Sequence, residues 1–102
     1  MGGRQIVTVR LPAALRSATD GRSTVHVDVA VDRPGPVTVG PVLAALKSIC
    51  PGAHHGTLDE RGEVRPHVNV FVGAENIRLA GGLATPVPLG DEVWILPAVS
   101  GG

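Results

Sequence analysis

The 102-residue chain is poor in cysteine and in aromatic residues: it has one cysteine, no tyrosine, and only Phe71 and Trp94 as aromatic side chains. A single Cys50 cannot form an internal disulfide. It also excludes a four-thiolate zinc or iron–sulfur centre built within one chain. A chain without disulfides fits a reducing cytoplasm. At 10.4 kDa the chain is long enough for one hydrophobic core, so residues 1–102 are expected to form a single domain.

Neither sign of charge dominates, because nine basic residues balance nine acidic ones. Without a broad cationic surface, nucleic acid is an unfavourable partner. The longest apolar run, residues 93–99, is interrupted by Pro97 and is far shorter than the ~20 residues that cross a bilayer. The first residues have no apolar signal-peptide core. We therefore expect a soluble, cytoplasmic protein with no membrane partner.

The spacing of apolar residues predicts an α+β domain. Period-two alternation indicates strands at residues 5–11, 25–31, 67–72 and 93–96, with a short strand at 77–79. Between them, one helix is predicted at 39–49, with Thr38 as N-cap and Pro51-Gly52 as its end. The expected fold is a mixed sheet of four to five strands packed on one main helix.

The segment after the helix and the last strand need separate treatment. Residues 52–66 are polar and stay unassigned between a helical turn near Leu58 and a small hairpin around Gly62. The strand at 93–96 is apolar on both faces, which favours a central position in the sheet. Along this strand Val93 and Ile95 share one face, and Trp94 and Leu96 share the other.

Beyond this strand the sequence ends in Gly101-Gly102, and two glycines alone are a weak signal. They gain weight from the motifs around them, which lie at residues 11–16, 81–85, 90–93 and 95–102. With these residues the sequence resembles the ubiquitin-like sulfur carrier proteins of the MoaD/ThiS family, which have a β-grasp fold. The spacing from Val70 through Arg78 to residues 81–85 looks closest to the CysO-type carriers, which feed a cysteine synthase.

The resemblance implies chemistry performed on this protein by other enzymes, with no catalytic residue, bound cofactor or metal of its own. An adenylating enzyme of the ubiquitin-activating type would use ATP with Mg²⁺ to activate the Gly102 carboxylate. A sulfur donor would then convert it to a thiocarboxylate for a sulfur-accepting synthase. The flexible tail 98–102, with Val99, Ser100 and Gly101, would enter the enzyme, while Trp94, Leu96 and Pro97 would form the docking surface. If the family's docking surface carries over, Val93 and Ile95 face the helix, and Trp94 and Leu96 face outward.

Other interpretations remain open. The chain would otherwise serve as the MoaD-like small subunit of molybdopterin synthase, as a ubiquitin-like modifier joined to lysines through Gly102, or as an interaction module with an incidental tail. Cysteine or specialised-metabolite biosynthesis is the first expectation for the pathway. Trp94 would otherwise simply cap the open sheet face. Cys50 is expected to be a buried hydrophobic residue, and His54, His55 and His67 lack a third metal ligand at fixed spacing.

Overall fold

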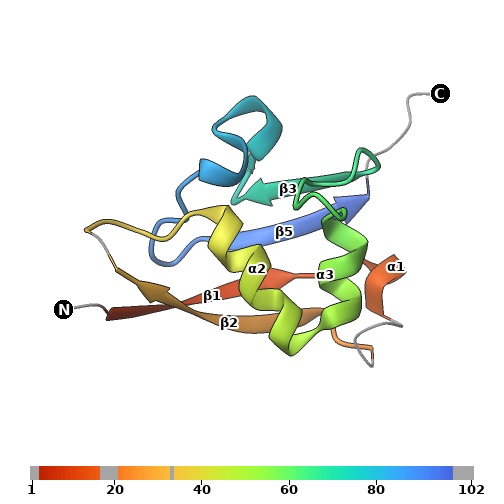
Figure 1. Cartoon of the computed structure of the whole chain (residues 1–102), viewed down its shortest axis with the longest axis horizontal. Helices are drawn as coiled ribbons and strands as arrows, with labels where there is room; N and C mark the ends of the chain where they lie inside the picture. The colour runs from red at the N-terminus through yellow and green to blue at the C-terminus, as the bar shows by residue number, and fades with distance from the viewer. Residues whose placement is uncertain (1–2, 17–20, 33, 98–102) are drawn as a thin grey trace.

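The computed structural model describes residues 3–16, 21–32 and 34–97. They form a five-stranded mixed sheet with the strand order β2-β1-β5-β3-β4. Two helices, α2 and α3, lie together on one face of this sheet (Figure 1). The predicted two-layer α+β architecture is confirmed, with five strands but with a second helix.

The first two strands form the predicted antiparallel pair. β1 (Gly3–Arg10) and β2 (Thr24–Val31) align with Val7 opposite Val27. Alternate valines on both strands are buried, so the period-two pattern in the sequence corresponds to one covered face. The connection contains the short helix α1 (Ala13–Arg16).

The last strand, β5 (Glu92–Pro97), occupies the centre of the sheet as predicted. It pairs parallel to β1, from Thr8 opposite Glu92 to Arg10 opposite Trp94. On its other side it pairs antiparallel to β3 (Val68–Val72) along its length. The short edge strand β4 (Glu75–Asn76) completes the sheet beside β3.

The main helix α2 (Val39–Ile49) follows the predicted bounds. Thr38 stands at its N-cap in an extended conformation, although its side chain makes no capping hydrogen bond. The buried face of α2 holds four of the five predicted apolar residues, Val39, Val42, Leu43 and Leu46. The fifth, Ile49, is 38% exposed. It lies in the last turn of the helix, which is followed at once by a change of direction at Cys50.

The main helix is followed by a further helix in the segment left unassigned, because Pro51, which was expected to end α2, begins α3 (Pro51–Thr57). Proline suits the first turn of a helix, where its missing N–H has no partner to lose. After α3, Leu58 forms an antiparallel bridge with Val64 across a turn that contains Gly62 at φ +80°. The segment left open in the sequence therefore holds both a helix and a small hairpin-like turn.

The predicted strand at 77–79 was wrong. These residues form a 3₁₀ helix, η2 (Ile77–Leu79), and the strand lies just before it in β4. The Asn76 side chain accepts a hydrogen bond from the Arg78 N–H at 3.0 Å, which caps the helix and ends the strand. A second 3₁₀ helix, η3 (Gly82–Ala84), follows. No helix in the described ranges is long and apolar enough to span a membrane.

Candidate functional site

The candidate site is the end of β5, from which the chain continues toward Gly102. Val93 and Ile95 are 0% and 1% exposed and pack in the core, whereas Trp94 and Leu96 are each 38% exposed. This confirms the predicted facing of the four side chains. Pro97 is exposed and ends the strand. The predicted tail residues Val99, Ser100, Gly101 and Gly102 lie outside the described residues.

Trp94 lies against Arg10 of the neighbouring strand β1. The Arg10 Cζ is 5.5 Å from the centroid of the Trp94 ring, within the range of a cation–π interaction. Arg10 Nε and Nη2 donate to the two carboxylate oxygens of Glu92 at 3.2 and 2.9 Å. Arg10 Nη1 donates to Thr24 Oγ1 on β2 at 3.0 Å. One guanidinium thus connects three strands on the exposed face.

The ion pair between Arg10 and Glu92 is partly shielded from solvent, with the two side chains 40% and 32% exposed. The hydrogen bond to Glu92 and, second, the negative charge of Glu92 raise the pKa of Arg10 above its ordinary value. Arg10 therefore stays charged at any physiological pH. Its charge is balanced locally, so the surface beside Trp94 carries no net positive charge from this pair.

A groove of about 340 Å³ lies beside Trp94, where β1 and β5 separate. The two strands pair only as far as Arg10 and Trp94. Beyond that point Leu11 turns toward β2, with its N–H donating to the Ser23 carbonyl at 2.8 Å. The groove is lined by the end of β1 with the residues that follow it, 10–13, and by residues 94–97 of β5.

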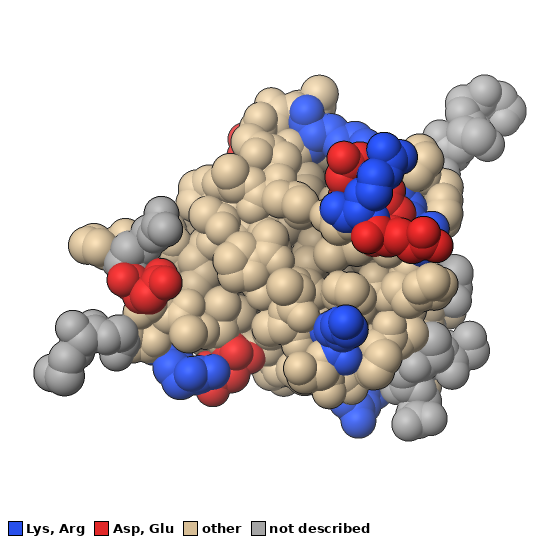
Figure 2. Space-filling model, viewed as in Figure 1, with Lys and Arg blue, Asp and Glu red and all other residues tan. Residues whose placement is uncertain are grey.

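A network of charged side chains lies over the segment that follows α3, and Figure 2 shows acidic and basic side chains crowded together there. Asp59 Oδ1 accepts hydrogen bonds from the N–H groups of Glu63 and Arg61 at 3.0 and 2.9 Å. The bond from Glu63 lowers the pKa of Asp59 most, against a smaller opposing effect of burial, and the bond from Arg61 adds to the lowering. This carboxylate holds the small turn together.

Arg78 joins this segment to the edge of the sheet. Its Nη2 donates to the carbonyls of Arg65 and Val68 at 2.9 and 2.7 Å. Val68 is the register partner of Pro97, so Arg78 braces the strand that supports the end of β5. Capping edge carbonyls in this way also leaves fewer of them free to pair with another chain.

A sequence profile of the ThiS family matches residues 9–102. The chain belongs to the ThiS family. It is 37% identical to the sulfur carrier protein CysO of Mycobacterium tuberculosis over 98 residues, which cover 94% of this chain and 98% of CysO. It is also 37% identical to small archaeal modifier protein 1 of Haloferax volcanii over 82 residues, 80% of this chain and 85% of that protein.

A solved structure supports the same assignment. The crystal structure of the Amycolatopsis orientalis BexX/CysO complex contains a chain that superposes with a TM-score of 0.76 at 33% identity, covering 94% of this chain and 99% of that one. The predicted membership of the MoaD/ThiS family, the β-grasp fold and the likeness to CysO-type carriers are confirmed. The relatives named here are carriers and modifiers by name, in agreement with a chain that other proteins act upon.

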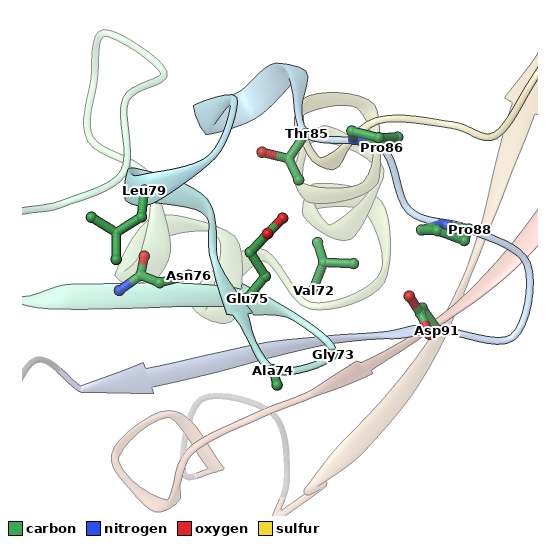
Figure 3. A pocket seen from close by; sticks show the side chains of 10 residues that line it. All are labelled: Val72, Gly73, Ala74, Glu75, Asn76, Leu79, Thr85, Pro86, Pro88 and Asp91. Carbon is green, nitrogen blue, oxygen red and sulfur yellow. The ribbon is translucent and has the colours of Figure 1, made fainter.

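A cleft of about 730 Å³ in this ThiS-family chain lies at the other end of β5 from Pro97 (Figure 3). Glu75 and Asp91 line it, and Figure 3 shows the Glu75 side chain extending from β4 toward Thr85. Thr85 Oγ1 is occupied by a hydrogen bond from the Gly81 N–H at 3.1 Å. The cleft is thus separated from the end of the strand that leads to the tail.

The remaining side chains singled out from the sequence lie apart from the candidate site. Cys50 is 3% exposed in the core, as expected for a small hydrophobic residue. His54 is partly buried in α3, whereas His55 and His67 are exposed. Burial, with smaller contributions from the charges of Lys47 and His55, lowers the pKa of His54. Among residues 3–16, 21–32 and 34–97 there is no group of three or more potential metal ligands.

Proposed function

We propose that this protein is a sulfur carrier whose Gly102 carboxylate is activated and then converted to a thiocarboxylate. The observation that carries the proposal is that the ThiS-family match runs through Gly101 and Gly102 and includes the whole of β5. The carrier protein CysO, matched over almost the full length of both chains, supports the same activity.

The proposed chemistry has two steps, both catalysed by a partner. In the first, an oxygen of the Gly102 carboxylate attacks the α-phosphate of ATP, so that pyrophosphate leaves and an acyl adenylate forms. In the second, a sulfur donor attacks the acyl carbon, AMP leaves, and sulfur takes the place of one oxygen. ATP with Mg²⁺ belongs to the adenylating enzyme of the ubiquitin-activating type. A synthase, of the cysteine-synthase kind or one of specialised metabolism, then accepts the sulfur.

The body of the domain supports this proposal as a surface for recognition. Trp94, Leu96 and Pro97 are exposed at the end of a central strand, and Ile6 is 70% exposed on the outward face of β1. Tryptophan is the residue type most enriched among those that dominate binding energy at protein interfaces. We propose that the adenylating enzyme docks on these side chains beside the start of the tail. Confining a reactive sulfur to partners that recognise the fold is a proximity effect.

The test is the intact mass of the protein after incubation with its adenylating enzyme, ATP, Mg²⁺ and sulfide. The expected product is heavier by the difference between sulfur and oxygen. Deletion of Gly102 is expected to abolish this gain, and Gly101→Ala to reduce it, because a methyl group widens the tail. Gly3→Ala is the matched control, since an added Cβ there meets nothing within 4 Å. Full modification of the Gly102 deletion would refute the proposal.

A second function, protein modification through an isopeptide bond from Gly102, is favoured by the relative that is a small archaeal modifier protein. Lys47 is the single lysine of the chain, and it is exposed on α2. If copies of this protein were joined side chain to tail, Lys47 would be the only lysine acceptor. Adducts on other proteins that form in the presence of ATP and disappear on deletion of Gly102 would support this function, and Lys47→Arg would identify self-linked chains.

A further inference from the structure

On the exposed face of the sheet, the Arg10 side chain contacts both neighbouring strands and an aromatic ring. It forms a two-point ion pair with Glu92, a hydrogen bond to Thr24 and a cation–π contact with Trp94. Arg4, the other arginine of β1, offers a comparison. Arg4, on the same strand and the same face, makes an ion pair with Asp28 at 2.7 Å and touches no aromatic ring.

These contacts restrict the Trp94 indole. A carboxylate that accepts two parallel N–H bonds fixes the plane of the guanidinium, because both bonds must be kept at once. The guanidinium in turn attracts the electron-rich face of the indole. Trp94 is therefore held in one orientation before any partner binds, and pre-ordering of this kind reduces the entropy that binding must otherwise overcome.

The restricted indole forms one wall of the groove of about 340 Å³ at the end of β5. Leu11, Pro12 and Ala13, which follow β1 in the chain, line the groove with it, and Leu96 and Pro97 of β5 continue the wall that Trp94 forms. Apart from Arg10, which Glu92 neutralises, all of the lining side chains are apolar. The groove thus suits an apolar side chain rather than a charged one.

The length of the tail indicates what fills the groove. Residues 98–102 follow Pro97, which itself lines the groove. Five residues reach at most about 17 Å when fully extended. An enzyme that holds Gly102 at its active site must therefore bring its own surface to this end of the domain. The occupant is then a side chain of that enzyme, and not a free small molecule.

We propose that Arg10 is a positioning residue, which holds Trp94 as one wall of a docking groove for an apolar side chain of the adenylating enzyme. This inference rests on the proposed function and adds to it the location of one contact and the residue that prepares it. Arg10 acts through Trp94 and is not assigned a part in the chemistry at Gly102.

The test measures pyrophosphate release by the adenylating enzyme with ATP and sulfide, at increasing concentrations of the carrier. Arg10→Met is expected to raise KM about fivefold with kcat unchanged, a factor that corresponds to about 1 kcal/mol of binding. Arg10→Lys keeps the positive charge but cannot form the two-point ion pair with Glu92, so its KM should stay close to that of Arg10→Met. Arg4→Met, the matched control that removes the other ion pair of β1, should leave both constants within about twofold.

Two further measurements separate positioning from a loss of stability. Trp94 is the single tryptophan and the chain has no tyrosine, so its fluorescence reports this site alone. Quenching by acrylamide should increase in Arg10→Met and stay unchanged in Arg4→Met, with both proteins folded by circular dichroism. Ala13→Glu places a charge in the groove at the first residue of α1. It should raise KM while leaving Trp94 quenching unchanged.

Each outcome decides a different point. Unchanged KM values for Arg10→Met and Ala13→Glu, with a wild-type protein that gains the thiocarboxylate mass, would overturn this inference and leave the proposed function intact. A fall in kcat at constant KM for Arg10→Met would also overturn it, because docking would not be the step affected. A wild-type protein that never gains the mass would refute the proposed function, and the inference would fail with it.

Discussion

Gln5 is a buried polar side chain of β1 that joins two loops at the end of the domain away from the tail. It is 5% exposed. Its Nε2 donates to the Val87 carbonyl at 2.9 Å, and its Oε1 accepts from the Val37 N–H at 3.0 Å. Replacement by methionine keeps the length and shape of the side chain but removes both hydrogen bonds. We predict that Gln5→Met is strongly destabilising.

The expected size follows from the two backbone groups that lose their partner. A buried donor or acceptor left without a hydrogen bond costs about 1–3 kcal/mol, so two of them would cost about 2–6 kcal/mol. A groove of about 520 Å³ borders Gln5 and admits water to this region, which favours the lower part of that range. We expect the free energy of unfolding to fall by about 2–4 kcal/mol.

The measurement is urea denaturation followed by Trp94 fluorescence. With a slope of about 2 kcal/mol per molar urea, the midpoint should fall by about 1–2 M. Ile6→Met is the matched control: it is the next residue of the strand, is 70% exposed, and should change stability by less than about 0.5 kcal/mol. Below its own unfolding range Gln5→Met should accept sulfur normally. A midpoint equal to that of the wild type would show that the two hydrogen bonds contribute no net stability.

Three further changes test other parts of the structure. Ile95→Ala should lower the free energy of unfolding by about 2–4 kcal/mol, since Ile95 is 1% exposed. Leu96→Ala, at a side chain that is 38% exposed, should lower it by less than about 1 kcal/mol and should mainly raise the KM of the adenylating enzyme for the carrier. The pKa of Asp59 is lowered in the folded state. The stability that its carboxylate contributes is therefore present above its unfolded pKa and is lost as the pH falls through the folded pKa. The difference in urea midpoint between wild type and Asp59→Ala should accordingly disappear in acid. Arg78→Met removes the donor to two carbonyls near the edge of β3 and should lower the unfolding free energy by about 1 kcal/mol, read from the same urea curves, with no loss if solvent replaces it fully.

The strands could be predicted because each has one buried face. In β1 the buried residues Val7 and Val9 alternate with Thr8 and Arg10, and β2 repeats the pattern. Burial of one face forces a period of two, which a sequence displays directly. In β5 all four residues from Val93 to Leu96 are apolar, so the strand period separates them into two faces, and the resemblance to the sulfur carriers indicated which face is exposed.

The second helix could not be predicted, because its residues are poor helix formers. α3 contains one proline, two glycines and two histidines within seven residues. Its stability comes from packing, with Ala53 and Thr57 fully buried. A Cβ at Gly56 would lie 2.5 Å from a methyl carbon of Leu15, so this glycine allows α3 to approach the segment after β1. Tertiary contacts of this kind outweigh local propensity and leave no period in the sequence.

The exposure of Trp94 and Leu96 could be predicted, but the residue that orders Trp94 could not. Arg10 and Glu92 are 82 positions apart in the chain. They meet because β1 and β5 run parallel in a particular register, which neither strand's own pattern specifies. An exposed arginine on an alternating strand gives no signal by itself, since most such residues face solvent alone.

The placement of β5 bears on the proposed handling of the tail by an adenylating enzyme. A strand at the sheet edge would have hydrogen bonds on one side only, and an enzyme that draws in the tail could peel it away. β5 instead pairs with β1 on one side and with β3 along its length on the other, while Val93 and Ile95 anchor it in the core. The last three residues of β5 pair with β3 alone, so a pull at Pro97 is resisted first by the hydrogen bonds to β3 and, from Trp94 inward, by those to β1 as well. β5 is therefore held on both sides up to Trp94 and is anchored in the core by Val93 and Ile95. Under the proposed function, these contacts keep Trp94 in place while a partner handles residues 98–102.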